Sequence, residues 1–83
     1  MVRPEAQEHT VWEKQVTPTE KLVVKVVVAK SGEAYLDMRR WFAPDDGGDW
    51  LPTKRGLRIH AEQLPEFLGA MHDAAKRIDA LYE

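Results

Sequence analysis

The chain has 83 residues, no cysteine and a formal net charge of −2 at neutral pH. This length suffices for one domain with a small core, and the absence of cysteine excludes a disulfide framework and a thiolate zinc site. Oligomerisation is the remaining means of strengthening such a core. Although the net charge is negative, the middle of the chain is basic, with eight Lys and Arg against five Asp and Glu in residues 21–58. This distribution indicates a local site for a polyanion.

The first twenty residues predict an N-terminal segment that is partly flexible and lies outside the main domain at residues 21–83. Residues 1–9 are polar and are expected to be disordered or loosely packed, residues 10–16 are a weak strand candidate, and Pro18 interrupts the chain after them. The start of the chain lacks the apolar core of a signal peptide, and the most apolar run, residues 22–29, is too short to span a bilayer. We therefore expect a soluble intracellular protein without a membrane partner, in the cytoplasm or nucleoid of a bacterium or the nucleus of a eukaryote.

A pair of strands follows, joined by a hairpin turn. Residues 22–30 are rich in valine, and residues 34–42 alternate between two kinds of side chain. The intervening KSGE sequence predicts the turn, because Gly32 tolerates a positive φ. In the second strand the alternation sends Leu36 and Met38 to one face of the sheet, and Tyr35, Asp37, Arg39 and Trp41 to the other.

Residues 43–60 predict a loop and two further short strands, and a helix completes the chain. The loop APDDGGD is rich in turn formers, WLPTK is a strand candidate that Pro52 restricts to an edge, and RGLRIH is a fourth strand. From about Ala61 to Leu81 apolar residues recur at helical spacing, and Pro65 is tolerated near the first turn. The resulting apolar stripe comprises Leu64, Phe67, Leu68, Met71, Ala74, Ala75, Ile78, Leu81 and Tyr82.

These elements predict an α+β domain, in which a four-stranded antiparallel sheet is followed by one long C-terminal α-helix. One helix can cover only one face of the sheet, and the apolar side chains of residues 22–28, 36–38 and 57–59 are the expected floor for it. The other face keeps Lys25, Tyr35, Arg39, Trp41 and Arg58. A long helix on a small sheet can also pack against its own copy across a two-fold axis, so we expect a homodimer. The predicted dimer interface consists of Leu57, Ile59, Phe67, Met71, Ala74 and Ile78.

The sequence YLDMRRWF, residues 35–42, places cations beside aromatic rings, the combination that single-stranded nucleic acid requires. Cations follow the phosphates, and unpaired bases stack on flat rings, each stack contributing roughly 1–3 kcal/mol with little dependence on sequence. Arginine adds cation–π contact and bidentate phosphate binding. The predicted nucleic-acid-binding residues are Lys21, Lys25, Lys30, Arg39, Trp41, Phe42, Lys54, Arg55 and Arg58. The same pattern also fits rings that anchor a core or interface and cations that only solvate a sheet face.

The combination of YLDMRRWF, then DGGDWLPTKRGLRI, then a helix that begins AEQLPEFL resembles the transcriptional coactivator positive cofactor 4 family. That family has a strand with Asp-x-Arg and paired aromatics, an acidic glycine-containing loop, a basic pair before a glycine and a C-terminal helix. The resemblance covers residues 22–78 and implies a homodimer that binds single-stranded DNA in basic channels with little sequence preference. Arg39 matches the family's strand arginine, Phe42 its base-stacking tryptophan, and Lys54 and Arg55 its basic pair.

Two positions depart from the family pattern. Lys30 stands where members often have an aromatic at the first hairpin, and Leu51 stands where a further basic residue is common. The departures imply weaker binding or a shifted path for the nucleic acid strand. Trp50 could supply a replacement ring beside this path.

Catalysis and metal binding find no support in the residue pattern. Asp37 has no second carboxylate to act with and is expected to be a structural partner of Arg39 or of a turn amide. Ser31 lies in a turn without a nearby histidine, and the histidines lack metal-ligand spacing. We therefore predict a non-enzymatic, cofactor-free module that binds single-stranded DNA, as a transcriptional coactivator or regulator or in DNA maintenance. The alternatives are RNA as the ligand, and a protein-interaction module of the transcription machinery with weak or no nucleic-acid binding.

Overall fold

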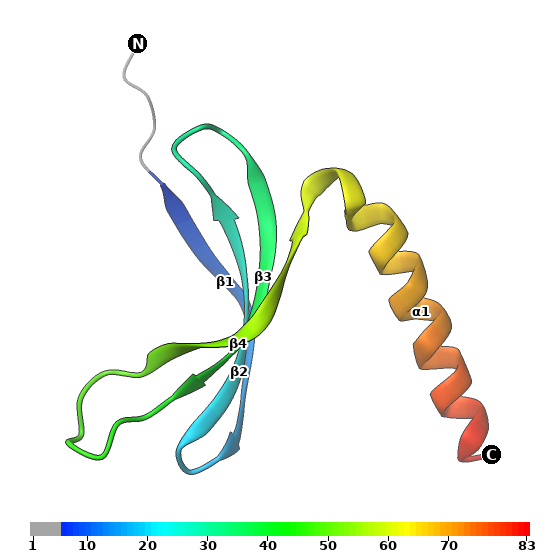
Figure 1. Ribbon diagram of the computed structural model, residues 1–83. Coiled ribbons are helices and arrows are strands. Elements are labelled where there is room, and N and C mark those ends of the chain that lie inside the picture. The colour runs from blue at the N-terminus through cyan, green and yellow to red at the C-terminus, as the bar shows by residue number, and fades with distance from the viewer. Residues whose placement is uncertain (1–5) are drawn as a thin grey trace.

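The computed structural model describes residues 6–83, in which four strands form one antiparallel sheet and a long helix follows (Figure 1). Strands that follow one another along the chain are also neighbours in the sheet. The elements are β1 (Gln7–Thr17), β2 (Glu20–Val28), β3 (Ala34–Phe42), β4 (Leu51–His60), a 3₁₀ turn (Ala61–Gln63) and α1 (Leu64–Leu81). The predicted α+β class, with one antiparallel sheet and then one helix, is therefore confirmed. No helix within this range is long and apolar enough to cross a membrane.

Two of the strands differ in their bounds from those that the sequence predicted. Residues 7–9, expected to be loosely packed, belong to β1, where Gln7 pairs with Val28 and His9 with Val26. Residues 50–54 and 55–60, expected to form two strands, contribute instead to the single strand β4. Pro52 is tolerated because β4 is an edge strand, where a missing N–H leaves no neighbour unpaired. Residues 1–5, also expected to be flexible, lie outside the described part of the chain.

The alternation along β2 and β3 gives the sheet a polar face and an apolar face. On the polar face the cross-strand pairs join Val23 to Arg39, Lys25 to Asp37 and Val27 to Tyr35. The only buried hydrophobic residues among residues 6–83 are Val23 and Val27, so the small core lies on this polar face. The apolar face carries Leu22, Val24, Val26, Val28, Leu36, Met38, Leu57 and Ile59.

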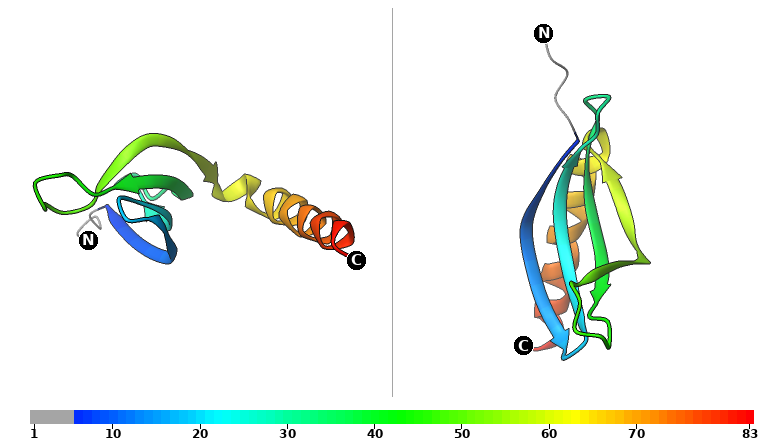
Figure 2. Two further views of the ribbon diagram at one scale, coloured as in Figure 1. Left: turned by 90° about the horizontal axis from the view of Figure 1, so that it is seen from below. Right: turned by 90° about the vertical axis from the view of Figure 1, so that its left-hand side faces the viewer.

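The expectation that the helix covers the apolar face of its own sheet is wrong within a single chain. The chain leaves the edge strand β4 through one 3₁₀ turn, and α1 then continues away from the sheet rather than back across it (Figures 1 and 2). The stripe of α1 stays open, with Leu68, Met71 and Ile78 about half exposed. Both apolar surfaces of the protomer therefore lack cover from the chain itself.

The shape of the protomer agrees with this open arrangement. Its radius of gyration is 15.9 Å, whereas a compact domain of this length has about 12 Å. Its accessible surface is 6979 Å², whereas a compact monomer of this mass exposes about 5,000 Å². A protomer with so much uncovered surface is poorly stabilised by its own core.

Candidate nucleic-acid interface

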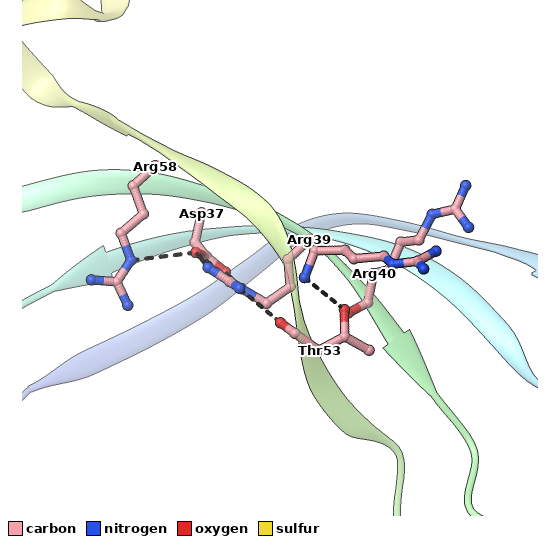
Figure 3. Close-up of polar contacts among 6 residues, drawn as sticks. Asp37, Arg39, Arg40, Thr53 and Arg58 are labelled. Atoms are coloured by element: carbon pink, nitrogen blue, oxygen red, sulfur yellow. Dashed lines mark hydrogen bonds and ion pairs between the residues drawn. The ribbon is translucent and has the colours of Figure 1, made fainter.

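A buried carboxylate organises the centre of the polar face. Asp37, on β3, is 8% exposed, and Arg39 donates to it from Nε to Oδ2 at 3.0 Å and from Nη2 to Oδ1 at 2.7 Å. On its other side the Nε of Arg58, from β4, lies 3.7 Å from Oδ1 (Figure 3). The hydrogen bonds from Arg39 hold the pKa of Asp37 below its ordinary value despite burial, and Arg58 adds to this effect. The predicted pairing of Asp37 with Arg39 is confirmed.

Two lysines of the polar face also have partners. Lys21 lies 3.7 Å from Glu13 and Lys25 lies 3.7 Å from Glu8, both acids being on β1. The Nζ of Lys25 also stands 4.4 Å above the ring of Trp41. Because this cation occupies one side of a half-buried ring, Trp41 offers a base less open surface than its place in the sequence suggested.

Trp50 joins the same cluster from the loop before β4. Its ring lies 4.9 Å below the Nζ of Lys21. The indole Nε1 of the neighbouring Trp41 is buried and has no hydrogen-bond partner within residues 6–83. The polar face is therefore a network of paired charges and partly covered rings, with an open groove of about 420 Å³ between them.

A bulge in β4 separates this network from the end of the sheet. Arg39 pairs with Gly56 and Trp41 pairs with Pro52, so three residues of β4 stand opposite a single residue of β3. Such bulges bend a strand and redirect its side chains. Within the bulge Lys54 lines the groove on the polar face, whereas Arg55 lines the grooves on the other side.

Gly56 allows the two strands to close up again after the bulge. A Cβ at this position would lie 2.7 Å from the carbonyl oxygen of Met38 and would also meet the Cβ of Arg39. No other side chain fits there without movement of the β3 backbone. The glycine of the basic-pair-plus-glycine motif therefore has a steric function in the sheet.

A second groove, of about 380 Å³, lies at the end of β3 beside the bulge. The ring of Phe42, 39% exposed, stands in its wall together with the side chains of Arg40 and Arg55. Arg40 is tied to Glu20 by an ion pair of 3.0 Å, whereas Arg55 makes no ion pair within residues 6–83. This groove combines an open aromatic ring with two guanidinium groups.

The structure therefore divides the nine predicted binding residues into three sets. Phe42 and Arg55 meet at the groove at the end of β3, and Trp41 also reaches it. The polar face holds Lys21, Lys25, Arg39, Lys54 and Arg58. Lys30 lies in the turn before β3, whereas Phe42 is the last residue of that strand, so the two stand at opposite ends of it.

Six of the nine residues that line the groove at the end of β3 are outside the predicted set: Thr19, Glu20, Arg40, Ala43, Asp45 and Thr53. Arg40 shares a face with Phe42 because the two are separated by two positions on one strand, a signal that the alternation already contained. Thr53 enters through the bulge, which no alternation indicates. Of the predicted dimer-interface residues, Leu57 and Ile59 lie on β4, and Phe67, Met71, Ala74 and Ile78 lie on α1.

Comparison with known protein families matches residues 12–70 to the family described as Transcriptional Coactivator p15 (PC4). No individual curated protein and no solved structure matches the chain. The matched range includes β2, β3, β4 and the first part of α1, and it contains both the Asp37–Arg39 pair and the bulge. Because this range is most of the sequence, the chain belongs to the Transcriptional Coactivator p15 (PC4) family of DNA-binding coactivators.

Proposed function

We propose that this protein is a non-enzymatic module that binds single-stranded DNA with little sequence preference, in transcriptional regulation or DNA maintenance. The observation that carries the proposal is the exposed ring of Phe42 in one groove with Arg40 and Arg55. An unpaired base can stack on the ring while Arg55, which makes no ion pair within residues 6–83, holds an adjacent phosphate. Arg40 contributes to phosphate binding only if the phosphate replaces or shares its partner Glu20. A base inside a duplex cannot stack in this way, so single strands are the preferred ligand.

The cations of the polar face take a secondary part in this proposal. Lys21 and Lys25 already have carboxylate partners on β1, so a phosphate must replace or share those partners. Lys54 and Arg55 make no ion pair within the described residues and are free to bind phosphates at once. We therefore assign the main electrostatic contribution to the bulge and smaller contributions to Lys21, Lys25 and Arg58.

The functional unit in this proposal is a homodimer. The apolar face of the sheet and the stripe of α1 are both open in the protomer, and their burial against a second copy would remove much of the excess surface. The interface residues that we propose are Leu57, Ile59, Phe67, Met71, Ala74 and Ile78. A dimer carries two grooves, so a long strand that reaches both binds more tightly than a short one.

The test is fluorescence anisotropy of a labelled 20-nucleotide single strand, with the matching duplex as competitor, at several salt concentrations. We expect salt-sensitive binding for which the duplex competes poorly. Phe42→Ala should weaken binding by roughly 5- to 150-fold, which corresponds to the loss of one base stack. Arg55→Gln should also reduce the slope of log K against log salt by about 0.7, the value for one phosphate contact.

Lys76→Gln is the matched control, because it removes one exposed cation from α1, away from the groove. This variant should retain the affinity and the salt slope of the parent. If Arg55→Gln and Lys76→Gln behave alike, the groove is not the binding site.

A protein-interaction module is the second candidate, and the paired charges of the polar face favour it. Charges that already have partners on the same chain are typical of a surface that packs against protein rather than phosphate. This candidate predicts no binding of the single strand even at low salt, and retention of a transcription protein in pull-downs performed with nuclease. RNA binding is distinguished by the same titration with a ribonucleotide strand.

A further inference from the structure

We infer that Thr53 is a positioning residue for nucleic-acid binding, which acts by fixing the β4 bulge so that Arg55 faces the groove beside Phe42. The inference rests on the proposed binding of single-stranded DNA. Thr53 itself is not inferred to contact the ligand. The side chain acts through the backbone of its neighbours.

The hydroxyl of Thr53 uses both of its hydrogen-bonding capacities inside the bulge. Its Oγ1 donates to the carbonyl oxygen of Arg40 at 2.8 Å and accepts the backbone N–H of Arg55 at 3.1 Å. The regular ladder is interrupted at this point, because Arg40 has no paired residue in β4. The hydroxyl thus replaces the ladder bond that the bulge removes, and it joins the two arginines that line the groove with Phe42.

Arg39 fixes the same residue from the polar face. Its Nη1 donates to the carbonyl oxygen of Thr53 at 2.8 Å, while its Nε and Nη2 bind Asp37 (Figure 3). The side chain of Arg39 is 17% exposed, and its charge is balanced by Asp37. Arg39 is therefore built into the support of the bulge, in a chain of contacts that runs from Asp37 through Arg39 to Thr53.

Because both the hydroxyl and the carbonyl group of Thr53 are hydrogen-bonded, the bulge keeps Arg55 near the groove before the ligand binds. Without the hydroxyl, three unpaired residues of β4 would sample other conformations, and binding would have to order them again. The ordering of one long side chain and its backbone corresponds to a loss of roughly five- to tenfold in affinity. The bound contacts themselves would remain available.

The test is a double-mutant cycle of Thr53→Val and Arg55→Gln, measured with the labelled 20-nucleotide strand. Valine has nearly the shape of threonine and lacks the hydroxyl, so Thr53→Val should weaken binding five- to tenfold. In the Arg55→Gln background the same change should have little further effect, because Thr53 acts through Arg55. Thr53→Ser restores the hydroxyl and should bind like the parent.

Amide hydrogen exchange gives a second readout that needs no ligand. The N–H of Arg55 should be protected in the parent and in Thr53→Ser, and should lose protection in Thr53→Val while the amides of β2 and β3 keep theirs. Additive effects in the cycle, or unchanged affinity of Thr53→Val, would overturn the inference. If the parent binds no single strand although its Arg55 amide is protected, the proposed function and the binding role of Thr53 are both refuted. If the Arg55 amide is unprotected in the parent, the hydrogen bond to the Thr53 hydroxyl is itself refuted.

Discussion

Replacement of Asp37 by Asn tests the central network of the polar face. The substitution keeps the size of the side chain but removes the charge that Arg39 and Arg58 share. The carboxylate accepts its two shortest hydrogen bonds from Arg39 at 2.7 and 3.0 Å, and an amide can accept only one of them well. The lost interactions leave a largely buried guanidinium without its counter-charge.

The expected loss of stability follows from this geometry. Removal of one partner from a buried ion pair costs about 3–5 kcal/mol. Arg58 is half exposed and can turn to water, so we expect the lower end, about 3 kcal/mol at pH 7. For a chain of this size that is a fall in Tm of about 12–24 °C. The melts must be compared at one protein concentration, because the proposed dimer would be stabilised by mass action.

The effect of this substitution should depend on pH in a defined direction. Arg39 lowers the pKa of Asp37 in the folded protein below its unfolded value of about 3.9. The stabilisation by the carboxylate is therefore complete above about pH 4 and is lost as the pH falls through the lower, folded pKa. The difference between the parent and Asp37→Asn should be constant from pH 7 to 5 and should shrink in more acidic solution.

Asp73→Asn is the matched control, because it removes the carboxylate of an exposed ion pair with Arg77 on α1. That surface pair contributes about 0.3–0.5 kcal/mol, so the control should melt close to the parent. The reasoning is refuted if Asp37→Asn costs no more than Asp73→Asn, or if its cost persists unchanged at low pH.

Three further predictions address the bulge, the β1 acids and the dimer. Gly56→Ala should destabilise the sheet by about 1–3 kcal/mol in denaturant titrations, because the new Cβ would lie 3.0 Å from the Cα of Arg39; an unchanged midpoint would contradict this packing. Glu13→Gln should strengthen single-strand binding two- to threefold and steepen its salt dependence, because it releases Lys21; weaker binding would exclude Lys21 from the interface. Met71→Asp should convert the dimer into monomer in sedimentation experiments, because it places a charge in the proposed helix interface; an unchanged mass would place the interface elsewhere.

The parts of the fold that depend on local periodicity were predictable from the sequence. The valines of β2 and the alternation in β3 indicate which side chains share a face, and the cross-strand pairs confirm both assignments. The helix ends at Leu81 as the spacing predicted, with Pro65 in its first turn. The strand alternation and the helical spacing can both be read from the sequence, since the first repeats over several residue pairs and the second over several helical turns.

The parts that depend on tertiary context were not predictable. β1 is exposed along its whole length, so its sequence carries little alternation by which its first residues could be recognised. The direction of α1 is decided in a single turn after His60, and a pattern of apolar residues does not encode that angle. The bulge depends on bonds between Thr53, Arg39 and Arg40, residues 13 and 14 positions apart.

The candidate site shows the same division. The motif located Phe42 and Arg55, and the structure brings them to one groove. The sequence did not distinguish among the cations of residues 21–58, because a count of charges does not reveal which of them already have carboxylate partners. The acids that form ion pairs with Lys21 and Lys25 come from β1, a strand outside the segment in which the charges were counted.

The central position of β2 has a consequence for how the protein remains in solution. Its sequence LVVKVVV combines high β-propensity with a single charge, which is the composition of segments that assemble into cross-β fibrils. β1 and β3 cover both of its edges, so no backbone group of β2 is offered to another molecule. β1 is thus a protective strand, and its loss by proteolysis would turn a valine-rich central strand into an open edge and a site of aggregation.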